Sequence, residues 1–406
     1  MSVSSIEWTD RVWNCVRGCS RVSEGCRNCY AETFAARNLP GMRSSTGEPF
    51  AVRTAAGPRW TGKVELIHSK LVEPLRWRKP QRVFVNSMSD LFHEALTGAA
   101  IAAVFGIMAL CPHITFQVLT KRADRMKDWT SRMADLSGRW MAMALSNLPI
   151  NYPRREPLQL PVGWPLPNVW LGVSVEDQAT ADARIPLLLQ TPAAVRFVSY
   201  EPALGPVDFQ RWVTGSRNIH VCMDVTGAIR NKSFSHLTGD DGRTLTRAEA
   251  EAQLRALEAS GVKVIPAGDC TDFDPQKGCR GHRNAHLDWI IVGGESGPGA
   301  RPFDVEWARS TVRQCRAAGV PVFCKQLGAR PFQGYLTAKE TLEGGKGRPR
   351  PADQQLTEDA AVDILAADLA LHVPIPQPLT LKDRKGGDPS EWPEDLRVRQ
   401  FPKENA

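Results

Sequence analysis

Four cysteines lie close together near the start of the chain. Cys19, Cys26 and Cys29 have the spacing C-x6-C-x2-C, and Cys15 lies just upstream. Two residues between cysteines allow both sulfurs to reach the same metal ion or cluster, so Cys26 and Cys29 form a chelating pair. The six-residue arm contains Gly25 and is long enough for the chain to bend back, which would let Cys19 supply a third ligand. The spacing therefore predicts a metal or iron-sulfur site in this loop.

The number of cysteine ligands decides which kind of site this loop forms. A structural zinc site closes four ligands around the ion, whereas three protein ligands leave one position open for a cofactor or substrate. Cys15 is the nearest fourth candidate, and no histidine precedes His68. If Cys15 binds, the loop is a closed zinc or iron-sulfur staple, and if it does not, one iron of a cluster stays free.

The bulk composition is that of a globular protein. Of the 406 residues, 42% are hydrophobic and 23% are charged, which excludes disorder as the main state. No basic and apolar leader and no run of eighteen apolar residues is present, so we predict a cytoplasmic protein that makes no use of a membrane. Ten cysteines in such a protein are not expected to form disulfides, because the cytosol keeps thiols reduced. The net charge of +7 suits a polyanionic partner as well as it suits simple solubility.

Downstream of the cysteines, short apolar runs alternate with helical patterns. Ile101, Val104, Phe105 and Met108 have helical spacing, and Gly319 is placed to end a helix before the last run. Strand followed by helix, repeated, predicts an α/β fold with a parallel (βα) partial or full TIM-like barrel, whose strands end on one common face. The six predicted strands are "RVFVNSMSD", "ITFQVLTKR", "NVWLGVSVED", "VRFVSYEP", "DWIIVGGESG" and "VPVFCKQ".

Two segments interrupt this alternation. Residues 1–330 form the predicted barrel, with the cysteine loop at 15–30. Residues 215–286 are predicted to be an insertion within it. Residues 331–406 are rich in proline, glycine and charge, and we predict a loop-rich extension that packs on the barrel.

The insertion carries a second group of metal-binding residue types. Cys270, Cys279 and His282 have the spacing C-x8-C-x2-H in a turn-rich stretch. Cysteine and histidine together suit zinc, although this spacing is not that of a standard finger. The segment could hold zinc or a second cluster, or it could be a loop with unpaired thiols.

Several motifs together resemble one family. They are "IEWTDRVWNCVRGCSRVSEGCRNCYAE", "FVNSMSDLFHE", "TFQVLTKR", "WLGVSVED", "FVSYEPALGPVD", "VGGESGPGARP" and "EDLRVRQFP". The chain resembles an uncharacterised phage-associated three-Cys-motif family that is regarded as radical-SAM-like. The resemblance covers nearly the whole chain outside the insertion, and it implies a barrel of the radical SAM type.

The resemblance implies a [4Fe-4S] cluster held by Cys19, Cys26 and Cys29, with Cys15 as a bystander. S-adenosylmethionine (SAM) would bind the open iron and be cleaved to a 5′-deoxyadenosyl radical. The common radical SAM signature is C-x3-C-x2-C with an aromatic residue before the last cysteine. In this chain the first gap is six residues, and the aromatic residue, Tyr30, follows Cys29.

Polar residues at the predicted strand ends could bind SAM. Its carboxylate needs a cation, and its amino group and ribose need acceptors. Lys121 or Arg122 could serve the carboxylate, Asp90 or Glu295 the amino group, and Ser174 with Glu176 the ribose, although such residues also cap helices. Asn86 and Ser89 complete the predicted cofactor-binding set, and the candidates for catalytic groups are His93, Glu201 and Lys325.

The substrate is predicted less directly. Phage association and a basic chain favour modification or repair of nucleic acid or a nucleotide. Arginine and tryptophan interleave at "RWTGK", "PLRWRKPQR" and "RMKDWTSR", which suits backbone contact and base stacking, but also helix faces where arginine stems cover a tryptophan. Alternatives are a non-enzymatic, metal-stapled nucleic-acid-binding protein and a radical SAM enzyme that acts on a peptide or small metabolite. A partner protein encoded nearby could complete the site.

Overall fold

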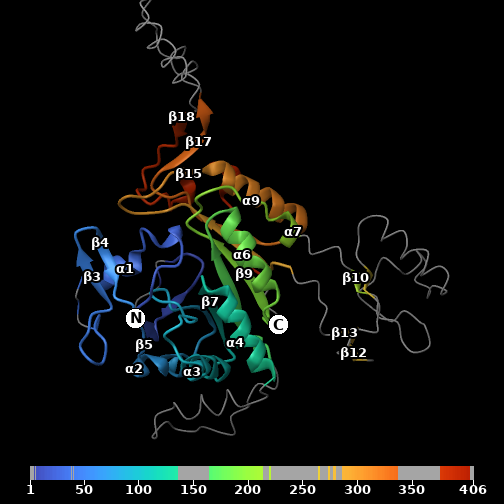
Figure 1. Ribbon diagram of the computed structural model, residues 1–406. Helices are drawn as coiled ribbons and strands as arrows, with labels where there is room; N and C mark the ends of the chain where they lie inside the picture. Colours follow the sequence, from blue (N-terminus) through green and yellow to red (C-terminus); the bar gives the residue numbers. More distant parts are fainter. Residues whose placement is uncertain are drawn as a thin grey trace, which may run out of the picture.

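A parallel β-sheet of seven strands forms the centre of the computed structural model (Figure 1). Neighbouring strands all pair in parallel, and they follow one another in chain order across the sheet. The sheet curls into a half-barrel, so the predicted α/β fold is confirmed and is compatible with a partial TIM-like barrel. The strands are β1 (Arg11–Trp13), β6 (Gln81–Val85), β7 (Ile114–Thr120), β8 (Val169–Val175), β9 (Val195–Tyr200), β14 (Trp289–Gly293) and β16 (Val322–Gln326).

The structure describes most of the barrel and part of the C-terminal extension. The described residues are 4, 6–37, 39, 41–135, 164–213, 219–220, 264–265, 273–274, 278–279, 286–336 and 375–402. The side chains of Cys270, Cys279 and His282, which form the predicted second metal site, lie outside them. Short strand pairs within 215–286 are β10 (Ile219–His220) with β11 (Val264–Ile265), and β12 (Phe273–Asp274) with β13 (Gly278–Cys279).

Helices pack on the outer face of the sheet, and several begin or end at capping residues. Thr97 accepts a hydrogen bond from the Ala100 amide at the start of α3, and Asp177 and Thr180 form a capping box at the start of α6. Gly319 has a φ of 69° and ends α9, as the sequence predicts. The helices are α3 (Gly98–Ala109), α4 (Ala123–Asp135), α6 (Gln178–Leu189), α7 (Gln210–Val213) and α9 (Val305–Ala318).

The two faces of the sheet have different cores because side chains alternate along each strand. The outward side chains join the helices in the main hydrophobic core. The inward side chains form a second, mainly aromatic core in the first half of the strands, where the Trp8 ring lies 4.6 Å from Phe84 and 6.2 Å from Trp289. Trp8 comes from the segment before β1, so the start of the chain fills the base of the half-barrel.

A long connection between β1 and β6 carries the cysteine loop. It contains α1 and an antiparallel hairpin of β3 and β4, which Figure 1 shows beside each other at the edge of the molecule. Ala35 of α1 and Ala36, which follows the helix, pack with Ala51 and Trp60 of the hairpin in a small separate core. The elements of this connection are β2 (Val16–Arg17), α1 (Tyr30–Ala35), β3 (Ala51–Thr54), β4 (Gly57–Trp60), β5 (Glu65–Leu66) and α2 (His68–Leu71).

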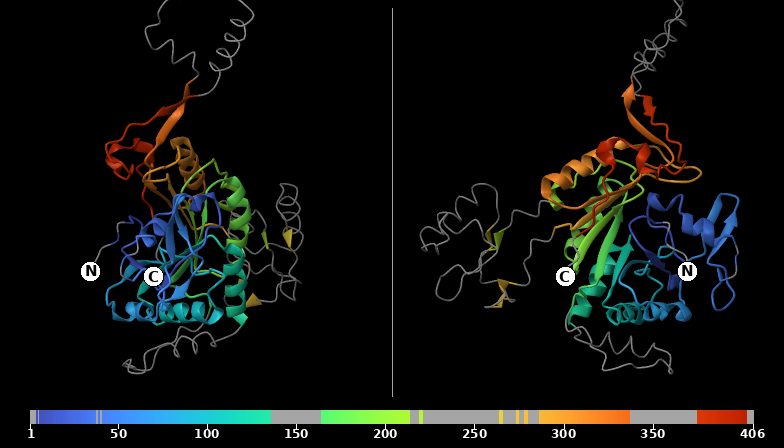
Figure 2. Two further views of the ribbon diagram at one scale, coloured as in Figure 1. Left: turned by 60° about the vertical axis from the view of Figure 1, so that its left-hand side comes forward. Right: turned by 180° about the vertical axis from the view of Figure 1, so that it is seen from behind.

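The described part of the C-terminal extension has two components. β15 (Phe303–Asp304), β17 (Pro331–Leu336) and β18 (Ile375–Pro378) form a small sheet whose β17 and β18 project away from the half-barrel (Figure 2). The last residues then run along the edge strand β16. The Cys324 amide donates to the Val398 carbonyl oxygen at 2.8 Å, and the Gln400 amide donates to the Val322 carbonyl oxygen at 3.0 Å.

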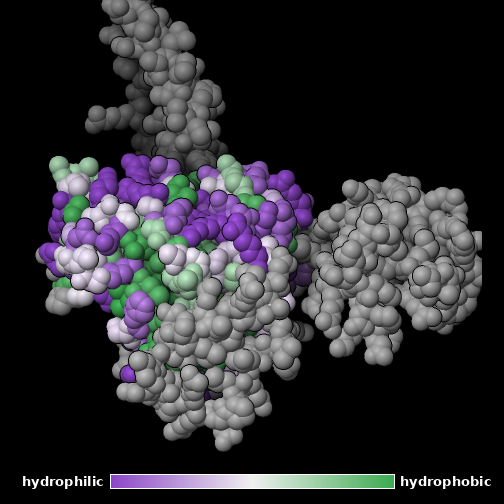
Figure 3. Space-filling view, turned by 60° about the horizontal axis from the view of Figure 1, so that its bottom comes forward, coloured by the Kyte–Doolittle hydropathy of each residue, from purple (hydrophilic) through white to green (hydrophobic). Residues whose placement is uncertain are grey.

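The described surface is mostly polar on the face shown in Figure 3. Hydrophilic residues border a central group of hydrophobic residues there. Among the described helices, none is both long enough and apolar enough to span a membrane.

Trp392 anchors the C-terminal segment, since it is 1% exposed and its indole N–H donates to the Gly386 carbonyl oxygen at 3.0 Å. We expect Trp392→Ala to lower the free energy of unfolding by about 3–5 kcal/mol, because it removes a large buried side chain. Urea unfolding measures this change. Lys385→Ala, at an exposed position of the same segment, is the control and should change it by less than about 0.5 kcal/mol. Equal effects of the two substitutions would contradict the anchoring role.

Candidate functional site

The cysteine loop lies across the carboxyl ends of the parallel strands. Ser23 donates to Glu176 Oε1, just after β8, at 3.1 Å, and Asn28 Nδ2 donates to Glu295 Oε2, just after β14, at 3.0 Å. The Tyr30 hydroxyl donates to the carbonyl oxygen of Ser87, just after β6, at 2.5 Å. Residues between the cysteines and directly after them thus contact three different strand ends. The topology brings the predicted metal ligands and the predicted cofactor-binding residues to one face of the sheet.

Glu176 is the most enclosed of these strand-end carboxylates, with 1% exposure. Besides the Ser23 bond, it accepts hydrogen bonds from Lys121 Nζ and, at 3.0 Å, from Arg184 NH1 of α6. Gly25 packs directly against it, because a Cβ at this position would lie 2.5 Å from Glu176 Oε1. Two cations compensate the buried charge, and the loop backbone is in contact with the carboxylate.

A second network lies beside Cys19. Asp90 accepts hydrogen bonds from Thr120 Oγ1 at 2.7 Å and from Arg122 NH1 at 3.0 Å. Arg122 also donates to Ser20 Oγ at 2.8 Å and to Glu94 at 2.8 Å. The carboxylates of Asp90 and Glu94 raise the pKa of Arg122 although its burial opposes this, so the guanidinium stays charged. Because Ser20 follows Cys19, Arg122 ties the first cysteine to the ends of β6 and β7.

His93 belongs to the same network and has a defined tautomer. The Ala95 amide donates to His93 Nδ1 at 3.1 Å, so the ring proton resides on Nε2. This Nε2–H donates to Ser20 Oγ at 2.8 Å. Burial and the nearby Arg122 lower the pKa of His93, so the ring is neutral at physiological pH.

Glu295 fixes the far end of the loop. It accepts hydrogen bonds from Arg301 Nε at 2.9 Å and Arg301 NH2 at 2.7 Å, in addition to the bond from Asn28. These donors lower the pKa of Glu295 in spite of its burial. Arg301 also donates to the Glu24 carbonyl oxygen at 2.9 Å, so this ion pair contacts the loop on both sides of Cys26.

The four cysteines of the N-terminal region differ in their surroundings. Cys19, Cys26 and Cys29 are partly exposed, whereas Cys15 is fully buried in the main core. Burial, the Asp90 carboxylate and the Cys29 sulfur raise the pKa of Cys19 to about 12. Burial and the neighbouring Cys26 also raise the pKa of Cys29. Cys29 therefore lies close enough to Cys19 and to Cys26 for the charges of their thiolates to interact.

Cys15 is buried in the main core, unlike these three thiols. Its Sγ–H donates to Asn86 Oδ1 at 3.6 Å, and the same oxygen accepts from the Val16 amide at 3.1 Å. Burial raises the pKa of Cys15 far above its ordinary value. Asn86, a predicted cofactor ligand, thus has its amide oxygen engaged in holding the chain after β1.

Glu201 and Lys325 form an ion pair at the carboxyl ends of β9 and β16. Lys325 Nζ lies 2.5 Å from Glu201 Oε1, and the two side chains are each 17% exposed. β14 lies between these strands, and its residue nearest the pair is Gly293, where a Cβ would lie 3.6 Å from Glu201 Cδ. The two long side chains therefore meet across β14, next to Gly293.

The predicted residues thus divide into two groups. Asp90, Arg122, Glu176 and Glu295 have most of their hydrogen-bonding capacity used by protein groups, whereas Glu201 and Lys325 make fewer protein contacts. Sequence reasoning missed several residues that complete the networks, which are Ser20, Ser23, Asn28, Arg184 and Arg301. The first three had a signal, because they lie between or beside the loop cysteines, whereas the partners of Arg184 and Arg301 depend on how the helix and loop fold back.

Within the described residues, no three histidine, cysteine, aspartate or glutamate side chains are arranged to hold one metal ion. A cluster is a different case, because each thiolate binds a separate iron and the sulfurs stand further apart than around one ion.

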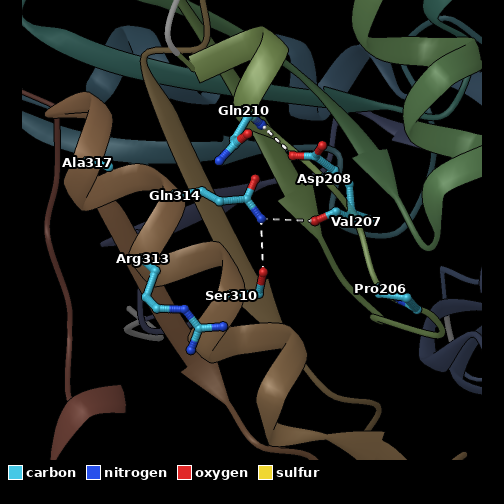
Figure 4. Close-up of a pocket in the computed structure, with 8 residues that line it drawn as sticks. All are labelled: Pro206, Val207, Asp208, Gln210, Ser310, Arg313, Gln314 and Ala317. Atoms are coloured by element: carbon cyan, nitrogen blue, oxygen red, sulfur yellow. Dashed lines mark hydrogen bonds between the residues drawn. The ribbon is translucent and has the colours of Figure 1, made fainter.

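A cavity of about 540 Å³ lies elsewhere, on the outside of the barrel next to α7 and α9. Figure 4 shows Gln314 within it, donating to the Val207 carbonyl oxygen at 3.3 Å and to Ser310 Oγ at 3.0 Å. Its lining contains no cysteine and none of the predicted site residues, so the cavity is separate from the candidate site.

The contact between Gly25 and Glu176 predicts a steric effect. The added methyl group of Gly25→Ala would overlap the Glu176 carboxylate, which Lys121 and Arg184 hold in place. We therefore expect the substitution to displace the loop and to lower the free energy of unfolding by about 1–3 kcal/mol. The rate at which a thiol reagent labels the protein should rise as well. Gly205→Ala is the control, since its Cβ would lie 3.6 Å from the nearest atom, Asp177 Cβ. Unchanged stability and labelling in Gly25→Ala would refute the contact.

His93 predicts a pH effect on stability. Its pKa is lowered in the folded protein, so the unfolded chain binds a proton near pH 6.5 that the folded chain does not bind. Stability contributed by the neutral ring is present above this pH and is lost as the pH falls. Arg122 and Arg125 oppose protonation, while Asp90 and Glu94 favour it. Urea unfolding at pH 7 and pH 5.5 should show a smaller loss in His93→Gln than in the wild type, and equal losses would disprove the assignment.

Comparison with known proteins gives one match. A family model described as a protein of unknown function (DUF5131) matches residues 3–356. No curated protein and no solved structure matches the chain. The matched residues include every strand of the half-barrel and the whole cysteine loop, whereas the described segment 375–402 lies beyond them. The chain therefore belongs to the DUF5131 family, whose function is unknown.

Proposed function

We propose that this protein is a radical SAM enzyme that binds a [4Fe-4S] cluster through Cys19, Cys26 and Cys29. The observation that carries the proposal is the position of these three partly exposed thiols, on one loop at the carboxyl ends of a parallel half-barrel. Ligands bind at this end in barrels of parallel strands. The fourth cysteine, Cys15, is buried in the core and bonded to Asn86, so the loop offers three thiolates.

The environment of the thiols supports binding of a positively charged group. Their raised pKa values mean that Cys19 and Cys29 keep their protons while nothing is bound. A thiolate must form before it can ligate, so binding would release protons. Thiolates at Cys19 and Cys26 would each repel a thiolate at Cys29, so a cation that neutralises them would favour their ionisation together.

A bound [4Fe-4S] cluster, reduced by an external one-electron donor, would supply the electron that cleaves SAM into methionine and a 5′-deoxyadenosyl radical. The chain's own residues would hold the site in place. Glu176, Glu295 and Arg122 fix the loop at three points. The aromatic core under the mouth of the half-barrel excludes water from below. Glu201 and Lys325, with few protein contacts, would bind the charged parts of a ligand in the mouth.

The test is a comparison of cysteine variants after anaerobic reconstitution. We expect the wild type and Cys15→Ala to bind iron and sulfide and to show the absorption of a [4Fe-4S] cluster. Cys19→Ala, Cys26→Ala and Cys29→Ala should lose most of the iron. With SAM and a strong reductant, the wild type should release 5′-deoxyadenosine. Each of the three variants should release at least about 100-fold less than the wild type.

Two outcomes would overturn the proposal. Full iron content in Cys26→Ala would show that the ligands are misassigned. Stoichiometric zinc, or a cluster that does not cleave SAM, would make the loop a structural staple and favour the alternative of a non-enzymatic, metal-stapled protein.

A further inference from the structure

We propose that the segment 17–63, which carries the cysteine loop and the β3–β4 hairpin, binds single-stranded nucleic acid. If the protein is the radical SAM enzyme proposed above, this nucleic acid is its substrate class. Only the role as substrate rests on that proposed function. Binding itself would need neither cluster nor SAM. Five arginines of this segment, here called the arginine surface, carry the argument. They are Arg17, Arg37, Arg43, Arg53 and Arg59.

The first observation is charge. Residues 17–63 contain eight basic and three acidic residues, so they hold most of the chain's net charge of +7. Each of the three acids already has a basic neighbour within the segment. Glu32 pairs with Arg21 at 2.5 Å, Glu48 with Lys63 at 2.7 Å, and Glu24 with Arg27 at 3.9 Å.

The arginine surface consists of the basic residues of the segment that are not used in these three ion pairs. Within the described residues, none of its five members has a carboxylate within ion-pair distance, in contrast to Arg122, Arg184 and Arg301 in the networks below the loop. Several unneutralised guanidinium groups on one small unit cost self-repulsion, and a polyanion relieves it. The guanidinium fork also matches the two oxygens of a phosphate.

The unit is held together by its own small core. Ala35 of α1 and the following Ala36 pack with Ala51, and Met42 and Trp60 pack against them. This core joins the helix that ends next to Arg37, the loop that contains Arg43, and both hairpin strands, which contain Arg53 and Arg59. The unit therefore displays four of the five arginines beside the cysteine loop. Arg53 and Arg59 lie on opposite faces of the hairpin, because Arg59 pairs with Val52 and not with Arg53.

The second observation is the distribution of exposed apolar side chains. In the part of the chain that the structure describes, the large hydrophobic residues with high exposure are Val22, Tyr30, Leu39 and Val52, at 38–60%. All four lie within the same segment. Basic groups next to an exposed aromatic ring are the combination that binds a single strand, whose phosphates meet the cations and whose bases stack on the ring. A duplex has its bases already stacked and offers only its phosphates to such a surface.

Tyr30 is the residue placed to stack a base. It is the most exposed of the four, at 60%, and its hydroxyl is fixed by the bond to the Ser87 carbonyl oxygen. Because Tyr30 follows Cys29 directly, a base on this ring would lie beside the proposed cluster.

The experiment is fluorescence anisotropy with labelled single-stranded DNA and RNA oligonucleotides, without SAM or reductant. The hairpin variant Arg53→Gln with Arg59→Gln should bind at least about tenfold more weakly than the wild type. Each phosphate contact to a single strand contributes about 0.7 to the slope of log K against log salt, so the slope should fall by about 0.7 for each of the two arginines that contacts a phosphate. The matched control is Arg313→Gln with Arg316→Gln, two exposed positions on α9, which should leave both values unchanged.

Tyr30→Ala separates stacking from charge. We expect it to weaken binding of the oligonucleotide by about 5-fold to 100-fold while leaving the binding of inorganic polyphosphate unchanged. Equal losses of oligonucleotide affinity in the hairpin variant and the α9 control would overturn the proposal, as would an absence of binding by the wild type. Tighter binding of an acidic protein than of either oligonucleotide would show that the partner is not a nucleic acid. Failure here would leave the release of 5′-deoxyadenosine intact, and failure of the radical chemistry would leave this binding intact.

Discussion

The buried carboxylate of Glu176 is the interaction on which the position of the cysteine loop depends. An ionised carboxylate with 1% exposure is stable only when several donors compensate it, and here they come from α6, from the end of β7 and from the loop itself. The loop is therefore part of what makes burial of this charge possible. Since Gly25 gives the backbone access to the carboxylate, the sequence of the loop is restricted at positions that bind no ligand.

The half-barrel divides into an apolar base and a polar mouth along the same strands. Side chains alternate between the faces, so each inward-facing series continues from an aromatic or aliphatic residue to a polar one, as from Phe197 to Ser199 and from Phe323 to Lys325. The aromatic side chains pack against one another inside the curved sheet, at the base of the half-barrel. The polar residues of the mouth lie on the same strands, so their positions follow from this packing. The polar side chains of the mouth are thus positioned by the aromatic core, although they are not part of it.

Sequence reasoning succeeded where local pattern decides structure. All six predicted strands form, because each is a short apolar run that a parallel sheet buries on both faces, and Gly319 ends its helix as predicted. β1 was missed, since three residues carry no periodic signal. The predicted site residues do gather at one face, but their individual partners could not be predicted. Arg184 and Arg301 reach Glu176 and Glu295 through tertiary folding that leaves no trace in spacing.

The C-terminal segment contacts strands of the half-barrel that lie far before it in the sequence. The Arg82 guanidinium lies 3.9 Å from the centre of the Phe401 ring, and the Trp289 indole N–H donates to the Gln400 carbonyl oxygen at 2.9 Å. Contacts between residues so distant in sequence form slowly, because a long loop must close first. During synthesis on the ribosome, β16 would emerge with its outer edge uncovered and would wait for about seventy more residues before its cover arrives. The edge of β16 is thus open to wrong strand pairing after all seven strands of the half-barrel have been synthesised and before residues 398–400 arrive.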